Sequence, residues 1–405
     1  MNLELILDLP PSKSLIYMER YVNDGSPSGF TFKYSTSKDY SPRFGKEKFK
    51  IPIIFPNSVK KYSYGTTMIN LKELIDGIPV HPDFYKKIKN SFPNYELSSF
   101  YNYPTASPRT LLSVKNENKF YSKLHYDGVL CRVKRKLPYR KAIAEVEISK
   151  HFEFYIDKNN VRNFAFLKSP FCNTYCTEEE AEQFSAIIRE YEPYPHLDLK
   201  KYLIPFFALF SQDINDLDAS KILIQLLNFN SNPKEVFLEK IIYPIIENYI
   251  NLVKYNGLIP EINAQNLLLE IDNDFNIHRI VFRDLMGVEK DLTVRQNIGL
   301  KNNFDSKKYK CISKKDPLYF KRHSFSYDFK LGKYVIEPLV KCFTEKFDYS
   351  KNKINNLVKE KAKEMWGDFA SFYFNSSELW YSHPKTLLVD KKSRIYLENK
   401  NPLYR

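Results

Sequence analysis

The side chains best suited to chemistry gather between Glu261 and Asp284, around two apolar runs. Between these runs, Asp272 to Asp274 has the Asn/Asp clustering of a tight turn, so the pattern predicts a β-hairpin with its polar groups together at the open end. Carboxylates and amides placed there would suit a hydrated divalent cation and a phosphate chain. A hairpin with merely structural polar ends is the alternative. The polar residues are Glu261, Asn263, Gln265, Asn266, Arg283 and Asp284.

A second candidate group surrounds His81. Pro82 fits the first turn of a helix, which would place Lys86 one turn further on. A histidine just before a helix start and a lysine one turn inside suit an anion. A loop histidine beside a solvated lysine is the alternative.

Two further stretches carry polar or basic side chains within strand-like sequence. Residues 104–109 form a polar turn leading into an apolar run at 110–114, and residues 132–141 contain six cations. Strands are also expected at 123–133, 152–156 and 164–167. The concentrated positive charge of the basic stretch suits an anionic ligand. The alternative is a strand end whose cations are solvated.

Helices are expected to dominate from about residue 178. Thr177 and the glutamates after it resemble a capping box that starts a helix through Ile188. A long apolar-faced helix from Pro233 to Tyr255 should kink at Pro244 and end at Gly257, just before the Glu261 group. Further helices are expected at 335–347 and 351–373, and a closing hairpin at 385–397.

Composition narrows the class of protein. The 405 residues, 43% hydrophobic, are enough for two or three packed units. A net charge of +14 favours anionic partners, but no long basic run or RNA-binding aromatic signature indicates nucleic acid. Five scattered cysteines indicate reduced, structural thiols. No secretory signal or membrane span is recognisable, so a cytoplasmic protein is expected.

In their order along the chain, these motifs resemble the NRPS-independent siderophore synthetases of the aerobactin-synthetase type. That family's central motif is Glu-x-His-x-Gln-Asn, preceded by Tyr-x-Gly and followed by Arg-Asp-x-x-Gly. The matching residues are Tyr255, Gly257, Glu261, Asn263, Gln265, Asn266, Arg283, Asp284 and Gly287.

Other family motifs have counterparts in the same order. The upstream Gly-His-Pro-x-His-Pro motif and Lys match Gly77, Pro79, His81, Pro82 and Lys86. The Pro-Thr-x-Ser-x-Arg-Thr motif matches Pro104, Thr105, Ser107, Arg109 and Thr110. Fainter matches are Lys123, Leu124, Cys131, Arg132, Arg135, Lys385 and the final Asn401-Pro402-Leu403.

The resemblance implies an α+β, hand-like fold. A reduced thumb-like region would span residues 1–103, a β-rich fingers region 104–177, and a mainly helical palm with a C-terminal hairpin 178–405. ATP would lie between fingers and palm. The sequence does not determine whether the protein is a monomer or a homodimer.

The resemblance also implies an AMP-forming ligase for siderophore biosynthesis and iron acquisition. It would activate a citrate-like polycarboxylate with ATP and Mg²⁺ and join it to an amine, hydroxylamine or alcohol. Asp284, Glu261 and Asn266 would hold the metal, and His81, Lys86 and Arg135 would be catalytic. The residues expected to bind ATP are Ser107, Arg109, Lys123, Arg132, Asn263, Gln265, Asn266 and Arg283.

Four positions depart from the family pattern: Asn263 replaces a histidine, Cys131 and Arg132 replace two hydroxyl residues, and Ile78 replaces the first histidine of the His-Pro pair. An active ligase with a changed substrate is one interpretation. The other is a catalytically impaired member that binds nucleotide or carboxylate, or serves as a partner subunit.

Overall fold

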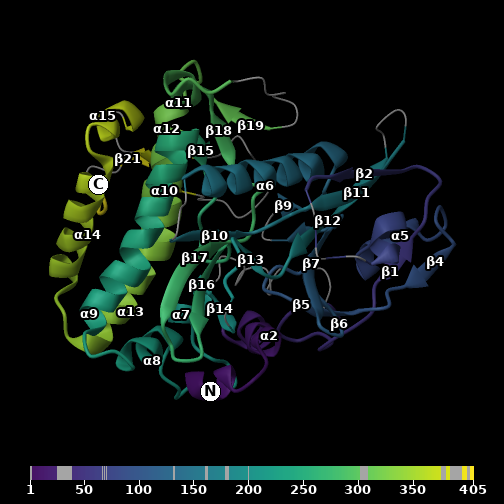
Figure 1. Ribbon diagram of the computed structural model, residues 1–405, viewed down its shortest axis with the longest axis horizontal. Helices are drawn as coiled ribbons and strands as arrows, with labels where there is room; N and C mark the ends of the chain where they lie inside the picture. The colour runs from purple at the N-terminus through teal and green to yellow at the C-terminus, as the bar shows by residue number, and fades with distance from the viewer. Residues whose placement is uncertain are drawn as a thin grey trace.

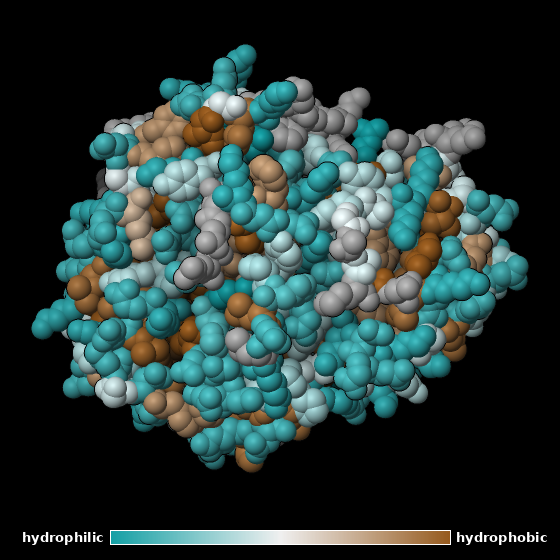
Figure 2. All heavy atoms as spheres, viewed as in Figure 1, coloured by the Kyte–Doolittle hydropathy of each residue, from teal (hydrophilic) through white to brown (hydrophobic). Residues whose placement is uncertain are grey.

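The computed structural model describes residues 2–24, 39–65, 67, 69, 71–130, 133–159, 163–177, 182–198, 200–301, 309–374, 380–383, 395–398 and 402–405. The fold is mixed α+β, with sheets of six and five strands and a layer of long helices beside the second sheet (Figure 1). The face seen in Figure 2 is mainly hydrophilic, with apolar side chains in small groups. None of the described helices is both long and apolar enough to cross a membrane.

The six-stranded sheet is antiparallel throughout. Its order is β2 (Val59–Ser63), β11 (Phe171–Cys176), β12 (Gln183–Glu190), β7 (Asn118–Leu124), β6 (Thr110–Lys115) and β5 (Tyr101–Pro104). Helix α6 (Tyr139–Asn159) packs across β11 and β12 (Figure 1). A small sheet of β3 (Ile78–Pro79), β1 (Pro52–Ile54) and β4 (Tyr95–Leu97) shares an apolar core with the large one.

The five-stranded sheet contains the predicted hairpin. Its order is β13 (Pro193–Tyr194), β10 (Phe164–Leu167), β17 (Ile277–Phe282), β16 (Leu267–Asp272) and β14 (Lys201–Pro205). Leu267 lies opposite Phe282, and Leu269 lies opposite Ile280. At the turn, the Asp272 carboxylate accepts hydrogen bonds from the amides of Asp274 and Asn276. The hairpin is therefore confirmed, with the local turn chemistry that indicated it.

The long helix before the hairpin is built from α9 (Pro233–Val236), a π-helical segment η1 (Phe237–Ile242) and α10 (Tyr243–Asn256). Gly257 ends it with a φ of 57°, as expected for a left-handed helix cap. A second π segment, η2 (Phe325–Ile336), leads into α13 (Glu337–Phe347). Each π segment ends two residues before a proline, Pro244 or Pro338, where wider turns accommodate the missing backbone donor.

Other elements complete the helical layer and its edges. Helix α14 (Lys351–Trp366) packs against α10 and α13 (Figure 1). The remaining elements here are α4 (Lys72–Asp76), α5 (Pro82–Ile88), α7 (Phe206–Phe210), α8 (Ile222–Asn228), β15 (Leu258–Ile259), β18 (Glu289–Asp291), α11 (Leu292–Asn297), β19 (Lys310–Ile312), α12 (Tyr319–Ser324) and α15 (Phe369–Tyr373). The closing hairpin pairs β20 (Trp380–His383) with β21 (Ile395–Glu398), and residues 384–394 lie outside the described part.

The chain's first helices, α1 (Leu3–Leu7) and α2 (Pro11–Tyr21), pack low in Figure 1 beside the two large sheets. Leu15 and Ile16 of α2 join a core cluster with Tyr121 of the six-stranded sheet and Leu268 of the hairpin. Helix α2 also contacts β14 and β5. It thus fills the seam between the two sheets.

Two predicted elements are wrong. Residues 152–156 belong to helix α6, where Ile148, Phe152 and Ile156 form a buried stripe at four-residue spacing. The helix expected through Ile188 is strand β12. Both faces of that strand are buried, Phe184 under the small sheet and Ile187 under α6, so its continuous apolar run did not show the alternation of a strand.

Three further stretches have a clear local structure. The apolar run at 203–210 is the end of strand β14 followed by α7. Cys172 and Cys176 lie on strand β11. Pro52 lies on β1, the central strand of its three-stranded sheet.

Three histidines make folding dependent on pH. Burial lowers the pKa of His81, His125 and His151 to about 4 each, below the usual value of 6.5. The unfolded chain therefore binds protons that the folded chain cannot bind between pH 6.5 and 4. Stability should fall as pH decreases through this window, by up to about 1.4 kcal/mol per pH unit for His81.

Thermal unfolding between pH 4.5 and 7 tests this expectation. Replacing the fully buried His81 by glutamine should make the decline of Tm towards low pH shallower. Equal slopes in the wild type and His81→Gln would contradict the expectation.

Candidate active site

A small polar cavity lies where the six-stranded sheet meets the open end of the β16–β17 hairpin. It is lined by Thr105, Ser107, Thr110, Tyr121, Arg189, Gln265, Asn266, Arg283 and Asp284. Its volume of about 20 Å³ leaves room for about one water molecule. The structure therefore brings residues of the 104–110 motif and of the Gln265–Asp284 motif to one cavity. A phosphate chain would have to lie at the mouth, or the two walls would have to part.

The segment before β16 is shaped by amide side chains. The Asn263 Oδ1 atom accepts hydrogen bonds from the backbone amides of Gln265 (2.9 Å) and Asn266 (3.1 Å). Asn266 Nδ2 donates to the Glu261 carbonyl at 2.9 Å. Asn263 therefore uses its side-chain oxygen to fix the turn.

Glu261 stands behind this turn and does not line the cavity. Its Oε1 atom pairs with Lys330 Nζ at 3.0 Å. Lys330 lowers the pKa of Glu261, against the opposing effect of burial. A Cβ atom on Gly287 would lie 1.7 Å from Glu261 Oε2. Only glycine at 287 lets the carboxylate occupy this position.

Asp284 belongs to a buried network of charges. Lys123, 1% exposed, pairs with Asp284 Oδ1 at 2.7 Å and with Glu145 Oε2 at 2.8 Å. Glu145, 0% exposed, also pairs with Arg189 at 2.5 Å. Burial alone would raise the pKa of Asp284, but Lys123, Arg189 and Arg109 outweigh it and hold the pKa below its usual value. Asp284 is therefore ionised.

Arg109 is a buried cation without a close carboxylate. Its side chain is 5% exposed, and its Nη1 atom donates to the Arg135 carbonyl at 2.8 Å. Within the described residues, no carboxylate lies within ion-pair distance of its guanidinium. Burial lowers its pKa to about 10, and the neighbouring Arg135 adds to this effect. Such a group is well suited to an anionic ligand.

Arg283 has a partner that the sequence did not indicate. Its Nη1 atom forms a close ion pair with Glu19 of α2, and its Nε atom donates to the Gln265 carbonyl. Glu19 Oε2 accepts from the Ala106 amide at 2.7 Å. The N-terminal helix thus contacts both walls of the cavity.

The three residues predicted to be catalytic do not line this cavity. His81 caps α5: its Nδ1 atom accepts from the Asp83 amide at 3.2 Å, and its ring packs edge-on against Tyr126. Lys86, with 64% of its side chain exposed, pairs with Asp83. Arg135 contributes its carbonyl to Arg109. Arg132 lies outside the described residues.

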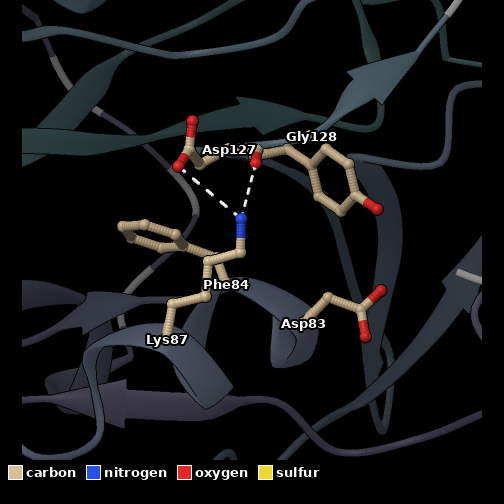
Figure 3. Close-up of a pocket in the computed structure, with 6 residues that line it drawn as sticks. Asp83, Phe84, Lys87, Asp127 and Gly128 are labelled. Carbon is tan, nitrogen blue, oxygen red and sulfur yellow. Dashed lines mark hydrogen bonds and ion pairs between the residues drawn. The ribbon is translucent and has the colours of Figure 1, made fainter. Parts of the chain in front are cut away.

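A second, larger cavity of about 270 Å³ lies beside α5. It is lined by Asp83, Phe84, Lys87, Tyr126, Asp127 and Gly128. The Lys87 amine reaches Asp127, donating to its carbonyl at 2.9 Å and pairing with its carboxylate at 3.6 Å (Figure 3). Strand β7 supplies Tyr121 to the first cavity, and the chain just after this strand supplies Tyr126, Asp127 and Gly128 to the second.

Sequence reasoning missed Glu19, Glu145, Arg189 and Lys330. Glu145 left the clearest signal, since it lies between the apolar residues Ala142 and Val146 in the sequence of α6. A single charged residue among buried apolar positions of a helix indicates a buried pair. The partners of Glu19 and Lys330 come from distant segments and leave no local pattern.

The oxygen donors suit a magnesium ion in part. Mg²⁺ is usually held by one or two carboxylates together with phosphate oxygens and water. Asp284 and Asn266 line the cavity and offer such donors, whereas Glu261 is engaged by Lys330. Within the part of the chain that the structure describes, no cluster of three acidic, histidine or cysteine side chains exists. The fit therefore rests on Asp284 and Asn266 rather than on the predicted trio.

Comparisons with known proteins find likeness in structure alone. No protein-family model and no curated protein matches the sequence. Petrobactin biosynthesis protein AsbB from Bacillus anthracis str. Sterne matches with a TM-score of 0.69 and 17% identity, over 98% of this chain and 78% of AsbB. ATP-bound aerobactin synthetase IucA from Klebsiella pneumoniae matches with a TM-score of 0.68 and 11% identity, over 99% of this chain and 80% of IucA.

Aerobactin synthetase IucC from the same organism has a TM-score of 0.67 and 12% identity, over 91% of this chain and 76% of IucC. These proteins are NRPS-independent siderophore synthetases, the family that the order of motifs resembles. The chain therefore has the fold of the NRPS-independent siderophore synthetases, on a sequence far diverged from theirs.

Proposed function

We propose that the chain is a divergent member of this family and an ATP-dependent, AMP-forming ligase. In the proposed reaction a carboxylate oxygen of a citrate-like acid attacks the α-phosphorus of ATP and pyrophosphate leaves. An amine, hydroxylamine or alcohol then attacks the acyl carbon, loses a proton and displaces AMP. The product is an amide or ester of the siderophore type.

One observation carries the proposal. Lys123 and Arg189 are balanced by Glu145 and Asp284, and Arg283 is balanced by Glu19. Among the described residues beside the cavity, Arg109 remains a buried cation without a carboxylate in ion-pair distance. It does not line the cavity itself, but it stands two residues after Ser107, which does, and the charge of Asp284 at the cavity acts on it. An anion entering there would recover the free energy that burial of Arg109 costs. A phosphate chain supplies that anion.

The chain's own residues then have distinct tasks. Ser107 and Arg109 would hold phosphate oxygens, and the amide side chains of Gln265 and Asn266 would orient them. Asp284 and Asn266 would hold Mg²⁺, which supplies positive charge to the phosphates when bound. Lys123 keeps Asp284 ionised and in place. These tasks are orientation and charge stabilisation, without a covalent nucleophile.

The proposal includes the three-region, hand-like organisation that the family resemblance implies. The thumb-like region would span residues 1–103, the fingers 104–177 and the palm 178–405. The cavity between the six-stranded sheet and the hairpin then corresponds to the junction of fingers and palm. Helix α2 and strand β12 each pack across this division, which makes the regions closely joined.

A non-adenylating binding protein is the second candidate. Asn263 stands where the family has histidine, and its side-chain oxygen is engaged by two backbone amides. This position therefore supplies no positive charge to a phosphate. Such a protein would still bind nucleotide or carboxylate through Arg109.

An assay of AMP and pyrophosphate formation separates the two candidates. With ATP, Mg²⁺ and a panel of citrate, succinate and related acids, at least one acid should support AMP release, and added hydroxylamine should trap it as a hydroxamate. ATP binding without AMP formation for any acid would remove the ligase proposal and favour the binding protein.

Arg109→Gln should lower kcat/KM for ATP by about 100-fold, because the variant loses the buried cation that faces the phosphates. Its matched control is Lys150→Gln, at an exposed lysine on α6. The control should behave as wild type in the same assay. A wild-type kcat/KM for Arg109→Gln would exclude Arg109 from the phosphate site.

Asp284→Asn should raise the Mg²⁺ concentration needed for half-maximal activity by about tenfold or more, since a carboxylate ligand becomes a neutral amide. The measurement is a magnesium titration at saturating ATP. Tm should be recorded alongside, because Lys123 loses one of its two partners. An unchanged magnesium requirement in a folded variant would rule out the metal role.

A further inference from the structure

We propose that Glu19, on the N-terminal helix α2, is a positioning residue for the phosphate-binding walls of the cavity. Its carboxylate bridges them: one oxygen pairs with Arg283 of the hairpin wall, and the other accepts from the Ala106 amide of the Ser107–Arg109 loop. This inference rests on the proposed function, because it concerns how the same site is held in shape.

The geometry of this bridge is specific to a carboxylate. Glu19 is 1% exposed, so water does not share its hydrogen bonds. Both partners are donors, a guanidinium and a backbone amide. A glutamine in its place would keep one acceptor oxygen and turn its own NH₂ group toward the other donor. One wall would then lose its attachment.

Each contact of Glu19 continues into a residue of the site. Arg283 also donates to the Gln265 carbonyl, so its ion pair with Glu19 sets the position of the Gln265–Asn266 turn. Ala106 directly precedes Ser107, and the Thr105 hydroxyl closes the same loop by donating to the Thr110 carbonyl at 2.7 Å. The distance between the walls therefore depends on one side chain from a third segment.

Hydrogen bonds and apolar contacts hold helix α2 in place, so the helix can determine the position of Glu19. Arg20 donates to the carbonyls of Lys46 and Glu47 at 3.1 and 3.0 Å. Tyr17 donates to Asp213 at 2.8 Å. Leu15 and Ile16 pack into the seam between the two large sheets. The helix thus fixes the place of Glu19 between walls that belong to different sheets.

The role is positioning rather than catalysis, because Glu19 is not among the residues that line the cavity. Its loss should displace the two walls that carry the proposed phosphate-binding residues, so the effect should fall on ATP rather than on the acid. A residue that is merely structural would lower Tm without separating the two substrates in this way.

The test compares two buried glutamate–arginine pairs that involve the same hairpin. Glu19→Gln breaks the pair at the open end of the hairpin. Glu270→Gln is the matched control: Glu270 is 0% exposed and pairs with Arg279 of the neighbouring strand at 2.6 Å, away from the cavity. We expect KM for ATP to rise about tenfold or more in Glu19→Gln, with KM for the acid unchanged. Glu270→Gln should lower Tm and leave both KM values unchanged.

Hydrogen exchange provides a readout that does not depend on activity. In Glu19→Gln, peptides covering residues 104–110 and 263–266 should exchange faster, and in Glu270→Gln they should match wild type. Equal rises of KM for ATP in both variants, or unchanged exchange at 104–110 in Glu19→Gln, would overturn the inference. If wild type neither binds ATP nor forms AMP, the proposed function fails and the exchange result alone decides whether Glu19 positions the walls.

Discussion

Burial of the Glu145 carboxylate is the constraint on which the site depends. An ionised carboxylate removed from water costs several kcal/mol unless charged partners compensate it. Glu145 is fully buried under the six-stranded sheet, and Lys123 and Arg189 supply that compensation from adjacent strands. The compensation requires α6 to lie across the sheet and the two strands to keep their register. Lys123 then carries the arrangement on to Asp284 at the cavity.

The site is a junction, and no single element forms it. One wall comes from the turn before β6, the other from the ends of the hairpin, and α2 fills the seam between them. Charges at this junction are paired across elements, so each pair also attaches one layer of the fold to another. The small volume of the cavity follows from these attachments. Widening the cavity must therefore work against ion pairs as well as against apolar packing.

The sequence was most informative where structure depends on neighbouring residues. The hairpin, the helix start at Pro82 and the stop at Gly257 each follow from a few consecutive side chains, and all three are confirmed. Two of the motifs that the resemblance singled out, at 104–110 and 265–284, line one cavity in the structure. By contrast, strand β12 was taken for a helix because both of its faces are buried, and α6 was partly taken for a strand because its aromatic residues favour strands.

The missed site residues have a different cause. Glu19 lies 264 positions from Arg283, and Lys330 lies 69 positions from Glu261. No local pattern records pairings of this kind, because they exist only once the layers have packed. The roles assigned to His81, Lys86 and Arg135 by analogy also depend on packing. None of the three is among the residues that line either cavity, and Lys86 is largely exposed.

The close approach of Gly287 and Glu261 has a consequence for how such sequences can diverge. A side chain at 287 would collide with the carboxylate at 261, so residue 287 cannot become larger unless residue 261 becomes smaller. Related chains should keep glycine at 287 wherever they keep glutamate at 261, and a larger residue at 287 should appear only beside a smaller one at 261. The residue types at 261 and 287 would then identify related chains in which the packing between these two positions has changed.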